Sequence, residues 1–438
     1  MYRVPDFEPD HAVTPPSLSL PELPRETKLV VGLIGGAEFV NHTYLVLFPP
    51  ILGLLAAEFD ATLGMLGLAM GVQGFTNAAF QLPFGYLSDN YDRRLALGLS
   101  MGLSTASVFV VALAPTFELL LVGQALLGIG VAGHHPVHFP LLADATPEHL
   151  RARAFSVRGF LGSLGFAAPP VVVTAVVGLP GMTWRHAVGL IGLFGAAYTL
   201  LTLAAFWRYV DAGTTTPEPG ESASGRGVGD RLRAELGAVV ASPAIVALAL
   251  LALVASVASW SVTSYAVVLL QDGYGLGLDV ANLSLTALFV AGAVMVLVGG
   301  YLSDRFSPGP VIVSSYLSVA LFVGVLASLA VAPWMAVVAV VLVGALRSLG
   351  GPARSKLADV LSARADLGRN FAIVSVGTMV GSAVAPPMVG ALIERGGLRV
   401  AFLAVAAASV LAAAVAFAIV QAYGAGTTPE AESAPGDD

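Results

Sequence analysis

The sequence contains no cysteine and very little charge. None of its 438 residues is Cys, and Asp, Glu, Lys and Arg together make up only 11%, against about 25% in soluble domains. The absence of thiols excludes disulfides, Cys-ligated metal sites and thiolate catalysis. With 56% of its residues hydrophobic, the chain has too few charged side chains to cover the surface of a soluble protein of this size. The composition therefore predicts a membrane protein.

Motifs typical of enzymes and of ATP-driven pumps are also missing. The sequence has no GxxxxGK[ST] loop and no recognisable catalytic triad. The GxGxxG of Gly128–Gly133 lies inside an apolar run with no preceding strand, so it indicates helix packing and not nucleotide binding. We expect no enzymatic activity, no cofactor, no bound metal and no nucleic-acid partner.

Twelve apolar runs are long enough to cross a bilayer, which takes about 20 residues per helix. They lie at 29–57, 62–87, 95–114, 118–142, 154–178, 184–206, 243–270, 280–302, 310–331, 333–353, 371–393 and 399–423. We predict an all-α membrane protein with six-helix bundles at 28–208 and 242–423. Between them, 209–241 is expected to be a cytoplasmic linker whose stretch 230–240 suits a surface helix. The segments 1–27 and 424–438 are expected to be disordered tails.

The basic residues fall on alternate loops. If the N-terminus is cytoplasmic, only Arg185, Arg395 and Arg399 of the loop arginines and lysines lie outside. Because cytoplasmic loops carry an excess of Lys and Arg, this pattern predicts that both termini are cytoplasmic. We expect a monomeric, multi-pass protein of the cell membrane.

The two halves carry the same short motifs at a fixed offset. Gly85–Asp89 reads GYLSD, and Gly300–Asp304 repeats it 215 residues later. At the same offset, Leu142–Asp144 and Leu357–Asp359 both read LAD. Matches in register predict pseudo-symmetric, duplicated bundles, an organisation found in many secondary transporters.

The segment Gly85–Arg94 resembles the signature that the major facilitator superfamily carries between its second and third helices. That signature has a glycine, an aspartate four residues later and then paired basic residues, and Asp92 stands where the family usually has glycine. The resemblance covers residues 28–423. It implies alternating access of two bundles about a central site, and a charge network that closes one face. The gating residues would be Gly85, Asp89, Arg93, Arg94 and Asp144, with Asp304 and Asp359 in the second half. The alternative is that these are ordinary loop charges.

A narrower resemblance involves the first and fourth spans. Glu38 and His42 with Pro49-Pro50, and Gly128-Ile129-Gly130 leading to His135-Pro136, are similar to the fosmidomycin-resistance-like branch of the superfamily. That branch exports small molecules, and its first span usually carries a histidine and an acid, here in swapped order. The resemblance favours efflux by proton antiport.

Glu38 is the central candidate for proton coupling. It lies about ten residues into its span, close to the bilayer midplane at about 1.5 Å per residue. A carboxylate there costs about 2.5–3.5 kcal/mol, so it should face a cavity or a partner. We predict that Glu38 gains and loses a proton during transport, together with His42 and His135. A paired, structural glutamate is the alternative.

Two arginines also lie within predicted spans. Arg347 is about fourteen residues into the tenth span, or about 21 Å deep. Because it keeps its charge, it needs an anion, and we expect an anionic substrate or Glu38 to supply it; a fixed ion pair is the alternative. Arg158 is only about four residues into the fifth span, and we expect it to reach the cytoplasmic surface.

Further polar side chains are candidates for substrate binding. His134 and His138 are one helical turn apart, a zinc-ligand spacing, but no cysteine or nearby carboxylate completes such a site. We expect protonation or substrate contact for His134; plain packing, or a metal exporter based on these histidines, is the alternative. In the second span, Gln73, Asn77 and Gln81 share one helix face. Trp260 and Tyr265 belong to an aromatic and hydroxyl cluster in the seventh span. Such groups either line a wet pocket or hold helices together.

The spans that carry these residues agree with one arrangement. The first, fourth, seventh and tenth spans hold the candidates, and the third, sixth, ninth and twelfth have no ionisable interior side chain. In the resembled fold the former line the cavity and the latter face lipid. We predict a secondary transporter of a small polar or anionic organic solute. An uptake symporter for organic anions and a non-transporting membrane sensor are the alternatives.

Overall fold

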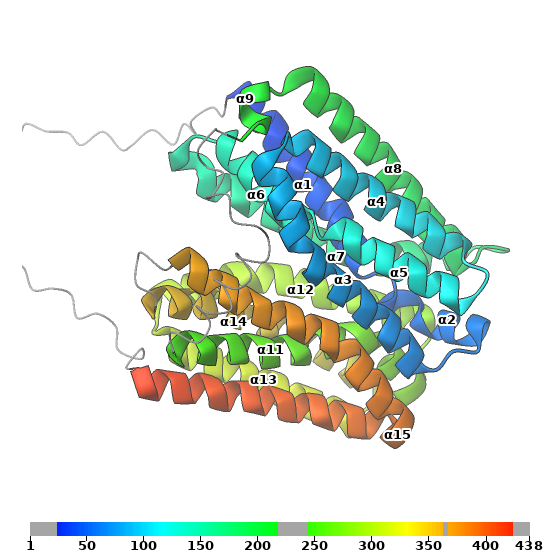
Figure 1. The fold of residues 1–438 in the computed structure, drawn as a ribbon. Coiled ribbons are helices and arrows are strands. Elements are labelled where there is room, and N and C mark those ends of the chain that lie inside the picture. Colours follow the sequence, from blue (N-terminus) through cyan, green and yellow to red (C-terminus); the bar gives the residue numbers. More distant parts are fainter. Residues whose placement is uncertain (1–23, 218–242, 362–366, 424–438) are drawn as a thin grey trace, which may run out of the picture.

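The computed structural model describes residues 24–217, 243–361 and 367–423, and these ranges are almost entirely helical (Figure 1). The first bundle consists of α1 (Arg25–Leu45), the 3-10 turn η1 (Pro49–Ile51), α2 (Leu52–Phe59), α3 (Leu63–Asn90), α4 (Arg93–Leu113), α5 (Phe117–Val131), α6 (His134–Asp144), the 3-10 turn η2 (Glu148–Leu150), α7 (Arg151–Val177) and α8 (Trp184–Tyr209), followed by the short α9 (Ala212–Thr215). The second consists of α11 (Pro243–Val268), the π-helical turn η3 (Leu269–Gly273), α12 (Leu278–Arg305), α13 (Pro308–Ala327), α14 (Pro333–Val360) and α15 (Leu367–Tyr423).

The predicted number of membrane crossings agrees with these helices. Ten described segments are long and apolar enough to span a bilayer. One of them ends with α15, whose 57 residues form two helices because Gly397 interrupts them with φ of 76°. The helix α3 has the necessary 28 residues but includes polar amides such as Asn77. Counted in this way, the described ranges contain twelve crossings.

Two crossings that the sequence predicts to be continuous are broken. The first changes direction at Pro49 and Pro50, which lack backbone N–H groups, and continues as α2. The fourth ends as α5 at Val131 and restarts as α6 at His134. A Cβ on Gly133 would lie 2.6 Å from Ser100 Cβ, so only glycine allows this close crossing with α4.

The bundles touch at one end and diverge at the other (Figure 1). At the end that carries α2, here the α2 end, the Tyr265 hydroxyl of α11 donates to Pro386 O at 2.7 Å and lies 3.2 Å from Leu63 O of α3. There the Gly64 N–H also donates to Glu394 Oε1 at 2.7 Å. The opposite end carries α9 and both described ends of the chain, and is here the α9 end.

The repeated motifs occupy equivalent helix ends. Gly85–Asp89 forms the last turns of α3, and Gly300–Asp304 those of α12. Gly85 lies inside α3, as the predicted span 62–87 implies, and α3 continues to Asn90. Asp92 instead caps α4, since its Oδ1 accepts the Arg94 N–H at 2.8 Å. The tail 1–23, most of the predicted linker with its surface helix (218–242) and the tail 424–438 lie outside the described residues.

Candidate functional site

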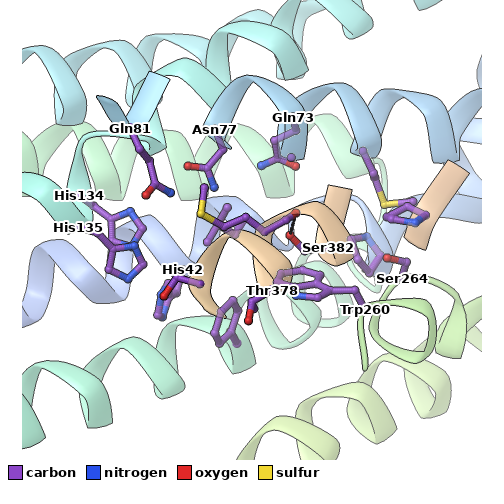
Figure 2. A pocket seen from close by; sticks show the side chains of 18 of the residues that line it. His42, Gln73, Asn77, Gln81, His134, His135, Trp260, Ser264, Thr378 and Ser382 are labelled. Carbon is purple, nitrogen blue, oxygen red and sulfur yellow. Dashed lines mark hydrogen bonds between the residues drawn. The ribbon is translucent and has the colours of Figure 1, made fainter. Parts of the chain in front are cut away.

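A cavity of about 540 Å³ lies between the two bundles (Figure 2). It extends from Pro49 and Pro386, near the α2 end, to Gln81 and Phe139, nearer the α9 end. Helices α1, α3, α6 and α7 of the first bundle and α11 and α15 of the second contribute its walls. The lining includes no residue of α4, α8, α13 or 398–423, in agreement with the four spans that the sequence assigns to lipid. The lining also includes no residue of the tenth span, α14, although we expected Arg347 of this span to bind the substrate.

One wall of the cavity is a row of amides on α3. Gln73, Asn77 and Gln81 follow one another at successive turns and all line the cavity, as their spacing predicts (Figure 2). Gln73 Nε2 donates to Tyr44 O at 3.5 Å. Asn77 Oδ1 is buried and has no hydrogen-bond partner among the described residues. The row therefore offers donors and acceptors to a solute.

The facing wall is aromatic. The His42 imidazole stacks on Phe166 of α7 with ring centroids 4.2 Å apart and planes 12° apart. Phe166 in turn meets Trp260 of α11 edge-on, with ring centroids 6.3 Å apart. The hydroxyl groups of Thr378 and Ser382 on α15 lie on the same side (Figure 2). A solute between the walls would contact rings on one side and amides on the other.

A buried charge cluster lies behind the histidines. Glu38 Oε1 is 2.7 Å from Arg158 Nη2, 3.4 Å from His42 Nε2 and 3.8 Å from His134 Nε2. Glu38 Oε2 is 3.1 Å from His138 Nδ1. These five residues are called the Glu38 cluster below. The Glu38 side chain is only 2% exposed, so the carboxylate is stabilised by these partners in place of water.

Local sequence features assemble this cluster. A Cβ on Gly162 would lie 2.8 Å from Glu38 Cγ, so this glycine lets α7 approach α1 closely. Arg158, one turn earlier on α7, then faces Glu38. The break before His134 turns α6 so that His134 and His138 both approach the carboxylate.

The expectation that Arg158 reaches the cytoplasmic surface is wrong. Its side chain is 7% exposed, pairs with Glu38 and lies with Cζ 4.3 Å from the centre of the Phe139 ring. A buried arginine next to a buried carboxylate is more stable than either charge alone. The pair gives Glu38 a fixed counterion.

His42 and His134 connect the cluster with the cavity. Both line the cavity and both contact Glu38, which is not among the lining residues. His134 Nδ1 lies 2.7 Å from Val131 O, so Nδ1 carries a hydrogen, and Nε2 faces Glu38 Oε1 at 3.8 Å. His135 lines the cavity as well and stacks on Phe139, with ring centroids 5.7 Å apart. These imidazole rings therefore lie between the cavity and the buried carboxylate.

Helix α1 supplies a carboxylate, that of Glu38, to the histidines of the fourth span. Ligand atoms of Glu38, His42 and His134 lie within 4.8 Å of one another, a spacing that would suit a metal ion. Arg158, however, already occupies Glu38 Oε1, and a cation beside this guanidinium would be repelled. Arg158 therefore disfavours a metal ion at this position.

Two candidate binding residues lie elsewhere. Arg347 Nη1 donates to Ser259 O, Ser259 Oγ and Thr263 Oγ1 at 2.8–3.1 Å, and Arg347 is not among the residues that line the cavity. Tyr265 is fully buried, and its hydroxyl joins the bundles at the α2 end. Both therefore hold helices together in this conformation.

The predicted gating residues gather at the α9 end. Arg93 is buried at the start of α4 and pairs through Nη1 with Asp144, at the end of α6. Arg94 Nη2 donates to Val210 O at 2.7 Å, and its guanidinium covers the Trp207 ring. Asp89 lies in the last turn of α3. In the second bundle, Lys356 of α14 donates to Ser303 O, and Asp359 is exposed. The side chain of Asp304 lies outside the described residues.

Removing the charge of Asp144 should weaken the helix pairing at the α9 end. We expect Asp144→Asn to lower the free energy of unfolding by about 1 kcal/mol, because Asp144 is partly exposed and water screens the pair. Thermal unfolding in detergent measures this, with Glu148→Gln, an exposed acid at the same end, as the control. Equal melting temperatures for both variants would contradict a role for the pair.

Three residues of the site were not selected from the sequence. His138 was visible as part of the histidine run, but its turn toward Glu38 depends on the helix break at Gly133. Arg158 pairs because Gly162 brings α7 to α1. Phe166 carries no signal of its own, since one phenylalanine in an apolar helix is ordinary.

Comparisons with known proteins agree with this architecture. The sequence model of the Major Facilitator Superfamily matches residues 34–281 and, in a second match, residues 248–436. The chain is 25% identical to the fosmidomycin resistance protein of Escherichia coli over 297 residues, which are 67% of this chain and 69% of that protein. It is 30% identical to the E. coli inner membrane transport protein YajR over 131 residues, only 29% of this chain and 28% of YajR. A solved bacterial homologue of the human lysosomal transporter Spinster, inward-facing and occupied, superposes with a TM-score of 0.74 at 16% identity, over 93% of this chain and 100% of that one.

Proposed function

The chain belongs to the major facilitator superfamily of secondary transporters, and from this premise we propose that it exchanges protons for a small organic solute. The observation that carries the proposal is the contact of the Glu38 cluster with the cavity through His42 and His134. An ionisable group buried inside a membrane protein usually serves an ion or substrate pathway. Here the pathway ends beside the space that would hold the solute.

We propose that the α9 end faces the cytoplasm. The basic residues Arg93, Arg94 and Arg151 belong to this end, whereas Arg185, Arg395 and Arg399 belong to the α2 end. The distribution follows the excess of positive charge in cytoplasmic loops. Since the bundles touch at the α2 end, the conformation described here is then open toward the cytoplasm.

The Glu38–Arg158 pair supplies a coupling step. With Glu38 ionised, the two charges neutralise each other inside the first bundle. A proton arriving through His42 or His134 makes Glu38 neutral and leaves Arg158 without a counterion. That change favours a conformation in which Arg158 contacts water or another acceptor, and Phe139, beneath its guanidinium, already lines the cavity. Protonation would in this way shift the balance between the two open states.

Liposomes containing the purified protein test both the transport and its direction. A pH gradient is imposed, and accumulation of a labelled probe is followed; fosmidomycin is one probe, because a relative confers resistance to it. An antiporter concentrates the solute in the acidic compartment, whereas a symporter concentrates it in the alkaline one. Accumulation in the alkaline compartment would replace our proposal by uptake symport. No proton-linked flux of any probe would favour a sensor.

A further inference from the structure

We infer that the cavity takes an uncharged, flat solute with hydrogen-bonding groups along one edge, such as a heteroaromatic carboxamide. The inference rests on the proposed function in assigning the cavity to the transported solute. It narrows the class of solute from polar or anionic to neutral and aromatic.

The charges near the cavity are already neutralised or turned away. Among the residues that the structure describes, its lining contains no Asp, Glu, Lys or Arg. The sequence assigns an anionic substrate to Arg347, but this arginine is held by Ser259 and Thr263 and contributes nothing to the lining. While Glu38 is ionised, its charge and that of Arg158 balance each other. An ion entering the cavity would therefore lose water without gaining a fixed countercharge, which is unfavourable.

The histidines do not change this balance. His134 donates Nδ1–H to Val131 O, and its Nε2 faces Glu38 and not the cavity. A second proton on this ring would add positive charge close to Arg158, which already neutralises Glu38. A neutral His134 adds no charge to the cavity, and its Nε2 is buried against Glu38.

The two walls have complementary chemistry for a flat molecule. Figure 2 shows Gln73, Asn77 and Gln81 in a row on one side, and Trp260 with Thr378 on the other. A ring lying against Trp260 gains stacking, while its edge reaches the amide row. The side-chain amides of the row carry both N–H donors and carbonyl acceptors, and a carboxamide carries both a donor and an acceptor. A carboxylate carries acceptors only and would pair with the N–H groups of the row alone.

Four probes of similar size separate charge from shape. They are quinoline-3-carboxamide (neutral, flat), quinoline-3-carboxylate (anion), 1-methylquinolinium-3-carboxamide (cation) and decalin-2-carboxamide (neutral, not flat). Their dissociation constants are measured by equilibrium dialysis at pH 8 against the full chain in nanodiscs, with empty nanodiscs as the blank. We expect the neutral flat amide to bind about tenfold more tightly than either ion and about fivefold more tightly than the saturated amide. Equal or tighter binding of the carboxylate or of the saturated amide would overturn the inference, as would no binding of the flat amide.

Variants assign this binding to the cavity. Trp260→Leu should raise the dissociation constant of the flat amide about tenfold. Trp260→Phe keeps an aromatic ring and should raise it less than about threefold. Trp334→Leu makes the same change at an exposed tryptophan outside the cavity and should have no effect. An unchanged dissociation constant in Trp260→Leu would place the probe elsewhere and reject the proposal. These experiments measure binding and not transport, so the two proposals can fail separately. If the flat amide binds best and depends on Trp260, but no proton-linked flux is found, only the proposed function is rejected. If proton-linked flux is found and favours the carboxylate, only this inference is rejected.

Discussion

Replacing Glu38 by glutamine is expected to reduce solute accumulation driven by a pH gradient about 100-fold or more, while solute-for-solute exchange continues. Glutamine has nearly the shape of a protonated glutamate but cannot titrate, so the cluster stays in one state. Movement of the bundles around a bound solute does not require the proton, and exchange should therefore persist. The measurement compares gradient-driven uptake with exchange in the same liposomes.

A loss of folding stability in Glu38→Gln has to be distinguished from a loss of coupling between proton and solute transport. Glu38→Gln leaves Arg158 as a buried cation without its counterion, and breaking a buried pair in this way costs about 3–5 kcal/mol. The double variant Glu38→Gln/Arg158→Gln removes both charges and should restore folding without restoring coupling. Glu58→Gln, an acid paired with Arg185 at the α2 end, is the matched control. Normal gradient-driven accumulation in the double variant would show that the proton is carried elsewhere.

Substituting valine for Gly67 is expected to reduce transport to background. A Cβ at this position would lie 2.5 Å from Pro386 O and 2.5 Å from the Tyr265 hydroxyl oxygen, both in the second bundle. Backbone atoms of α15 cannot move away as a flexible side chain can, so the α2 end cannot close. Because the clash lies between the bundles, each bundle should still fold.

Labelling distinguishes this blocked state from unfolding. The chain has no cysteine, so Ser264→Cys places a single thiol in the cavity wall. A membrane-impermeant maleimide added from the side of the α2 end should react with it faster in Gly67→Val than in the parent. Gly102→Val adds the same side chain where a Cβ meets nothing within 4 Å, and it should neither label faster nor lose transport. Normal transport by Gly67→Val would mean that this contact is not required for closure.

The fold is predictable from the sequence because the bilayer imposes simple rules. Length and apolarity define the crossings, and the repeat of GYLSD at Gly85 and Gly300 relates the two halves. The breaks at Pro49 and Gly133 are harder to predict, because prolines and glycines also occur inside unbroken membrane helices. Gly133 is required by its close approach to Ser100, a contact between residues distant in sequence.

The candidate site is predictable only in part, because the depth of a residue in a membrane helix does not determine which neighbour its side chain faces. Glu38 and Arg347 lie deep in their helices, yet the first pairs with Arg158 and the second with hydroxyl groups of α11. The sequence gives no rule for choosing between these partners. The amide row on α3 was predictable because three polar residues at successive turns must share a face. For Tyr265 the sequence leaves two roles open, because an aromatic hydroxyl suits a pocket and an interhelical contact equally well.

The atoms around Glu38 bear on which gradient the transporter can use. Its described close partners are nitrogen atoms of three imidazoles and one guanidinium, whereas hard metal cations are held by several oxygen ligands. At this site a sodium ion would have a single carboxylate as oxygen ligand, and that carboxylate is already paired with Arg158. We therefore expect the same solute flux in sodium-rich and sodium-free media of equal ionic strength, with the electrochemical potential of hydrogen ions as the driving force.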